Sequence, residues 1–342
     1  MNINRSTLKK ATDKGIITAE QAKALCIFIE SEQQNTAQFT FTHLLYYFGA
    51  LIAIGAMTLL MNLGWSSFGG LGILLFSLIY AAIGLYLANS FNNKGLRVPS
   101  GLCATFIICL TPLAVFGLQD WLGLWPEGVD YREYHRVIEW HWIYMELSTL
   151  VVSALIFVRF RYPFMLMPVA ITLWYMAMDV AVMIVGPDAE WQTRKLITMY
   201  GGLLMTAFAL LVDYKTRDSD DYAFWLYLCG VLAFWGGMTA QASDSELAKF
   251  IYMCINVLLL CVGVLLNRRI FTIVGGVGVF IYLNHLAVKV FEDNFLYPIS
   301  LTVIGFALIR LGVWFHKNKA EIEVRIEKFV PIWLARLREA RR

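Results

Sequence analysis

The stretch IFTIVGGVGVFIYLNHLAVK, residues 270–289, decides the fold of this chain. It has about 20 mostly apolar residues, the length that an α-helix needs to cross roughly 30 Å of hydrocarbon. Within it, Gly278, Tyr282, His285 and Lys289 recur every three or four residues, so they share one face of the helix. Exposing an imidazole and an ammonium group to lipid is costly, so we expect this face to meet other helices or water.

The rest of the chain has the same character. Of its 342 residues, 59% are hydrophobic and 15% are charged, whereas a soluble domain is about half apolar and a quarter charged. The excess falls in blocks of roughly 20 residues. We place spans at residues 43–63, 67–88, 100–119, 141–158, 163–185, 195–212, 222–241, 247–266, 270–288 and 296–315. The sequence therefore predicts an all-α fold, a polytopic transmembrane helix bundle of about ten spans.

The positive charges predict how the bundle is oriented. If the N-terminus is cytoplasmic, the segments between the spans alternate, and all but six of the 28 Lys and Arg residues fall in cytoplasmic segments. The six on the outer side are Arg132, Arg136, Arg194, Lys195, Lys249 and Lys289. Cytoplasmic loops of membrane proteins carry such an excess of Lys and Arg. We therefore expect both termini to be cytoplasmic.

Two further segments flank the predicted transmembrane domain, residues 39–316. Residues 1–38 read as a cytoplasmic pair of short helices, the second opened by a capping box between Thr18 and Gln21. This pair would lie on the membrane or bind a protein partner. Residues 317–342 form an amphipathic basic helix, which we expect to lie on anionic lipid headgroups.

Several spans carry a polar stripe on an otherwise apolar helix. In addition to the face of residues 270–289, there are three such stripes: Glu146, Thr149 and Ser153; Thr172, Tyr175 and Asp179; and Lys249, Tyr252 and Asn256. From them we take Glu146, Asp179, Asn256, Asn284, His285 and Lys289 as candidates for one outward-facing cavity that binds a proton or a substrate. The alternative is structural, with these groups as hydrogen-bonding contacts between helices.

Two weaker patterns allow more than one interpretation. The run Gly275, Gly276, Val277, Gly278 fits either close helix packing or an unwound segment of the kind found in transporters. His135, Glu139 and His141 have a spacing that partly resembles a metal site, but they do not share one face, and no metal is predicted. No phosphate-binding loop or hydrolase motif is present, so no cofactor and no nucleic-acid partner is expected.

One resemblance extends over a short motif. Leu8-Lys9-Lys10, followed by Lys14-Gly15-Ile16-Ile17-Thr18-Ala19-Glu20-Gln21-Ala22 ahead of a polytopic domain, resembles domain-of-unknown-function family 2157. These are bacterial membrane proteins, so the resemblance implies a multi-pass protein of the bacterial inner (cytoplasmic) membrane. It implies no activity and no site residues. In architecture alone, the ten-span layout is similar to that of drug/metabolite transporters.

Two classes of function follow from these features. The first is a secondary transporter for a small solute, coupled to protons through Glu146 and Asp179, with His285 and Lys289 as counter-charges. The second is a non-transporting membrane scaffold or envelope-assembly factor that binds partners through its cytoplasmic termini. An enzyme acting on lipid-linked material at the outer face, through Glu139, His141 and Glu146, is a third and weaker interpretation.

Overall fold

The computed structural model describes residues 8, 11–12, 15–25, 41–125, 140–185, 191–216, 220–241 and 245–290, with isolated positions between 299 and 318. These residues form helices and the turns between them, and none of them is in a strand. The chain divides into two compact units, Met1–Leu60 and Met61–Arg342. Most of the predicted tenth span and all of residues 319–342 lie outside the described residues.

In the first unit, the capping box predicted near residue 18 is present. The Thr18 backbone N–H donates to Gln21 Oε1 at 3.0 Å, and the Gln21 backbone N–H donates to Thr18 Oγ1 at 3.2 Å. These reciprocal bonds satisfy two N–H groups that have no partner within the helix. Gly15 precedes this turn with a φ of +68°, a conformation that glycine adopts without strain.

Eight long α-helices are described along the chain. They are α3 (Phe41–Asn93), α4 (Arg97–Trp121), α5 (Trp140–Phe160), α6 (Leu166–Val185), α7 (Trp191–Lys215), α8 (Phe224–Thr239), α9 (Glu246–Leu266) and α10 (Arg269–Val290), with a 3₁₀ turn η2 (Pro163–Met165) before α6. Helix α3 is broken at Gly69, whose φ of 61° and ψ of −178° are not helical. The break lies near the start of the second predicted span, residues 67–88.

Seven helices of the described residues are long and apolar enough to cross a membrane. They are Phe68–Asn93, Arg97–Trp121, Trp142–Phe160, Pro163–Val180, Gln192–Lys215, Glu246–Leu266 and Arg269–Leu286. Two more predicted spans appear as shorter apolar helices, Leu44–Met57 and Phe224–Thr239. The chain is thus an all-helical, multi-pass membrane protein over this part, whereas the count of ten spans stays a prediction.

Helix α5 shows how these helices divide between lipid and protein. Its exposed side is apolar, with Leu147 48%, Val151 59% and Leu155 67% exposed. A continuous apolar surface of this kind is unfavourable in water but not in the hydrocarbon region of a membrane.

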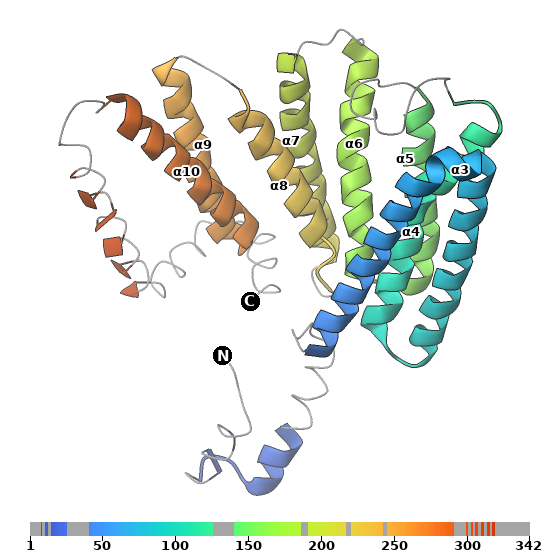
Figure 1. Cartoon of the computed structure of the whole chain (residues 1–342). Coiled ribbons are helices and arrows are strands. Elements are labelled where there is room, and N and C mark those ends of the chain that lie inside the picture. Colours follow the sequence, from blue (N-terminus) through green and yellow to red (C-terminus); the bar gives the residue numbers. More distant parts are fainter. Residues whose placement is uncertain are drawn as a thin grey trace. The chain divides into compact units, whose positions relative to one another are not determined.

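The turns that carry positive charges gather at one end of the second unit. The Tyr222 hydroxyl, just before α8, donates to the backbone carbonyl of Arg161, between α5 and η2, at 2.9 Å. Burial and then the charge of Asp220 raise the pKa of Tyr222, against the lowering effect of Arg97 and Arg161 nearby. The turn between α9 and α10 lies at this end too (Figure 1), and its Arg268 pairs with Asp221 of the turn before α8. These positively charged turns of the described residues therefore lie together, and their cytoplasmic location stays a prediction.

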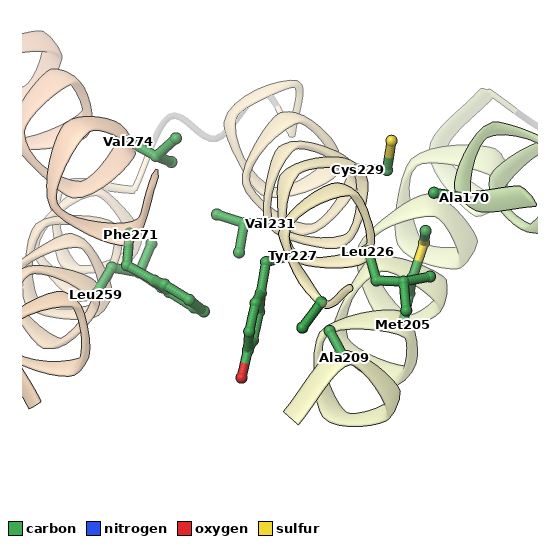
Figure 2. Packing of buried hydrophobic residues seen from close by; sticks show 11 residues of the cluster. Ala170, Met205, Ala209, Leu226, Tyr227, Cys229, Val231, Leu259, Phe271 and Val274 are labelled. Carbon is green, nitrogen blue, oxygen red and sulfur yellow. The ribbon is translucent and has the colours of Figure 1, made fainter. Parts of the chain in front are cut away.

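The core of the second unit lies where α6, α7 and α8 meet α9 and α10. Figure 2 shows Tyr227 and Val231 of α8 directed toward Phe271 of α10, while Leu226 faces Met205 on the opposite side. Glycines let the helices approach: a Cβ on Gly230 of α8 would lie 2.9 Å from the Thr206 backbone nitrogen of α7. Small residues at helix contacts are typical of membrane proteins.

Candidate functional site

The polar stripe of α5 faces the protein interior, as its spacing predicted. Trp142, Glu146, Thr149 and Ser153 are 1%, 6%, 1% and 3% exposed. The Thr149 hydroxyl donates to the Met145 carbonyl at 2.7 Å, and the Ser153 hydroxyl donates to the Thr149 carbonyl at 2.6 Å. The two hydroxyls are therefore satisfied within α5 itself, and Glu146 is the group of the stripe that must find its partner on another helix.

That partner is Asp179 of α6. The carboxyl group of Asp179 lies close enough for its charge to act on Glu146, and Asp179 is also only 6% exposed. Within the described residues, no N–H or O–H donor lies in hydrogen-bond reach of either carboxylate oxygen of Glu146. Two carboxyl groups can hydrogen-bond to each other only when one carries a proton, so this geometry suits a pair that holds a proton.

Aromatic rings cover the α5 stripe one turn before Glu146. The Trp142 ring centroid lies 5.1 Å from that of Trp125, which in turn lies 4.5 Å from that of Phe116 in α4. Both contacts are edge-to-face, the favourable arrangement for aromatic pairs. Three large rings near the start of α5 therefore bury apolar surface beside the carboxyl pair.

Asn256 belongs to a different place, the contact between α9 and α10. It is 0% exposed. Its Oδ1 accepts a hydrogen bond from Trp235 Nε1 at 3.0 Å, and its Nδ2 donates to the Tyr252 carbonyl at 2.8 Å. Its side chain lies against Gly278, where a Cβ would overlap it. The predicted stripe of α9 and the predicted face of α10 therefore meet each other.

His285 lies farther along the same face of α10, beside a cavity. The cavity has a volume of about 530 Å³ and is lined by residues of α7, α8, α9 and α10, with Lys249 and His285 among them. Glu246 bridges these two: its Oε1 lies 2.7 Å from Lys249 Nζ and 3.4 Å from His285 Nε2.

Four of the six candidates thus occupy three separate locations. Glu146 and Asp179 form a pair between α5 and α6, Asn256 is enclosed between α9 and α10, and His285 lines the cavity. Glu146, Asp179 and Asn256 are not among the residues that line it. Asn284 is exposed and does not line it either. The side chain of Lys289 lies outside the described residues, as do Glu139, His135 and the side chain of His141.

The sequence did not lead us to predict a further polar cluster. Arg268, 8% exposed, binds Asp213 of α7 through two nitrogens, Nε to Oδ2 at 3.2 Å and Nη2 to Oδ1 at 2.6 Å. Its Nη1 also pairs with Asp221, and its Cζ lies 5.1 Å from the ring centroid of Tyr227. Asp213, a carboxylate inside an apolar helix, was the signal that could have found it. Counting Arg268 only as a loop charge concealed the pair.

The cluster keeps Arg268 charged. Burial lowers the pKa of the guanidinium, but the hydrogen bonds and charges of Asp221 and Asp213 outweigh burial and raise the pKa above its ordinary value. A two-pronged guanidinium–carboxylate bond fixes the geometry of both partners. We therefore interpret this cluster as a structural clamp between α7, the turn before α8 and the turn before α10.

Comparison with known proteins adds no relative from which a role could be taken. No family model, no curated protein and no solved structure matches this chain.

Proposed function

We propose that this protein is a secondary transporter that moves a small solute across the membrane together with protons. The observation that carries the proposal is the Glu146–Asp179 pair, two buried carboxyl groups close enough to influence each other on neighbouring apolar helices.

The physical argument concerns charge in a medium of low polarity. One ionised carboxylate inside the hydrocarbon region costs at least about 2.5 kcal/mol, and two adjacent ones also repel each other. A proton shared between them removes one charge and supplies the missing donor. The pair can therefore bind and release a proton whenever its access to water changes, which is what coupling to a proton gradient requires.

Purely structural use of this pair is the weaker alternative. Two carboxyl groups are a poor choice for joining helices, because amides and hydroxyls do so without a charge. Asn256 shows that solution elsewhere in the same protein.

The test uses the whole chain in liposomes that contain a pH-sensitive dye. A potassium diffusion potential, negative inside, should drive proton uptake in wild-type liposomes. We expect Asp179→Asn and Glu146→Gln to reduce uptake to the rate of protein-free liposomes. The control Asp220→Asn, an exposed carboxylate in the turn before α8, should retain the wild-type rate. Equal rates for the wild type and both variants would remove the proposal.

A second measurement separates loss of function from loss of folding. The carbonyl stretching band of a protonated carboxyl group, followed by infrared spectroscopy, should be present in the wild type and lost in the double variant Glu146→Gln with Asp179→Asn, which has no carboxyl group left at this place. If the folded double variant keeps the whole band, the pair does not hold the proton.

We also propose that the protein resides in the bacterial inner membrane. The family resemblance of the N-terminal motif and the alternation of positive charges support this location.

A further inference from the structure

The cavity among α7, α8, α9 and α10 has an apolar wall and one polar end. Its volume of about 530 Å³ is within the range of small-molecule sites. The apolar lining includes Phe234, Ala248 and Ile255, and the polar lining includes Lys249, Tyr252 and His285. Such an arrangement favours a molecule with one apolar part and one polar group.

The polar end is arranged around a carboxylate. Lys249 and His285 both line the cavity, and Glu246 reaches both with a single oxygen, at 2.7 and 3.4 Å. One anionic oxygen can therefore contact an ammonium and an imidazole at the same time. Glu246 itself does not line the cavity, and its side chain is 63% exposed. An exposed ion pair of this kind contributes little to stability, so Glu246 can leave at small cost.

We propose that this cavity binds a small amphipathic anion, whose carboxylate or phosphate oxygen replaces that of Glu246 between Lys249 and His285. The apolar part of the anion would lie along the side chains of α8 and α9, such as Phe234 and Ile255. Glu246 then acts as an internal competitor that occupies the cationic end when no ligand is bound. The claim that the transported solute binds in this cavity rests on the proposed function. The claim that the cavity binds an amphipathic anion does not.

The binding experiment uses octanoate as the probe and the full chain in nanodiscs of zwitterionic lipid. Radiolabelled octanoate is measured by equilibrium dialysis against protein-free nanodiscs. Octanol and octylammonium, which have the same chain but no negative charge, should fail to compete. A photoreactive octanoate should crosslink to peptides of α8, α9 or α10.

Two substitutions at the polar end should act in opposite directions. Lys249→Gln should weaken octanoate binding about tenfold, the loss expected for a charge-assisted bond worth about 1.4 kcal/mol. Glu246→Gln should strengthen binding several-fold, because it removes the competitor. Lys94→Gln, an exposed lysine in the turn after α3, should change nothing. Destabilisation alone would weaken binding in both variants, so the opposite signs exclude it.

Other outcomes would overturn the inference. Weaker binding in Glu246→Gln would mean that the site prefers cations, and unchanged binding in Lys249→Gln would place octanoate elsewhere. The tryptophan of Ala248→Trp should fill the cavity. If this variant keeps its melting temperature and still binds octanoate, octanoate binds elsewhere. Adding phosphatidylglycerol to the nanodisc tests the source of the anion. If the lipid competes with octanoate, the natural ligand is a lipid; if it does not compete, the ligand is a dissolved solute. Because none of these measurements involves proton flux, this inference and the proposed function can fail separately.

Discussion

Asn256 shows how one polar side chain can fix the contact of two apolar helices. It is fully enclosed, and both ends of its amide are hydrogen-bonded, to Trp235 of α8 and to the backbone of its own helix. Gly278 provides the space for it on α10. An amide in hydrocarbon would cost several kcal/mol without partners. The pair of Asn256 and Gly278 therefore specifies how α9 and α10 align.

Gly278→Ala tests this contact. The added Cβ would overlap the enclosed amide of Asn256, so we expect a loss of about 1–3 kcal/mol in the free energy of unfolding. The measurement is denaturant unfolding in detergent. The matched control is Gly276→Ala in the same helix, where nothing lies within 4 Å of the new Cβ. It should be neutral or slightly stabilising, because alanine favours helix by about 1 kcal/mol. Equal losses in both variants would contradict this account.

At the scale of the element, one face of α8 binds the α9–α10 hairpin along its length. The face consists of Tyr227, Val231, Trp235 and Thr239, four residues apart. The Tyr227 ring lies 5.5 Å from that of Phe271, and the Thr239 and Tyr252 hydroxyl oxygens lie 3.0 Å apart. Arg268 adds the charged clamp at one end of this face, and the cavity lies at the other.

Arg268→Leu tests the clamp. It leaves the carboxylate of Asp213, 2% exposed, without its guanidinium, so we expect a loss of about 3–5 kcal/mol in the free energy of unfolding. Arg269→Leu, its exposed neighbour in sequence, should cost about 0.5 kcal/mol or less.

The double variant Asp213→Leu with Arg268→Leu separates charge from packing. Replacing a buried ion pair by apolar groups is often neutral, so the double variant should regain most of the stability that Arg268→Leu loses. If the double variant is less stable than Arg268→Leu alone, the clamp contributes more than the cost of an unpaired carboxylate.

At the scale of the whole molecule, the second unit has two ends of different composition. The turns with Arg161, Tyr222 and Arg268 lie at one end of the second unit. At the other, the Gln241 amide contacts Met199 Sδ at 3.5 Å, beside the cavity. The positive-inside rule predicts that the first end is cytoplasmic. The cavity would then open toward the outer side.

Cysteine labelling tests this orientation across α8, the 16-residue helix between the two ends. A helix of this length spans only about 24 Å, so its crossing needs proof. Asp220→Cys should react with a membrane-impermeant maleimide only in inverted vesicles, and Ser245→Cys only in intact cells, each compared with the parent chain. The reverse pattern would mean that the protein has the opposite orientation in the membrane. If both cysteines react from the same side, α8 does not cross the membrane.

The sequence by itself determined the class of this protein and the sides of its helices. The free energy of moving a side chain from water to hydrocarbon is a property of that side chain, and helical periodicity is local. The apolar blocks therefore predicted the membrane helices, and the spacing of Glu146, Thr149 and Ser153 predicted their burial, which is confirmed. The inward direction of Tyr282 was predictable in the same way.

Only the tertiary structure decided which polar faces meet. Nothing local to α5 says that Glu146 will meet Asp179, or that Arg268 will bind Asp213, 55 positions away. Asn284 and His285 are adjacent in sequence, yet one is exposed and the other lines a cavity, because successive residues of a helix point about 100° apart. A stripe of polar residues requires a partner, but the choice of partner depends on how whole helices pack, and that is a property of the assembled bundle.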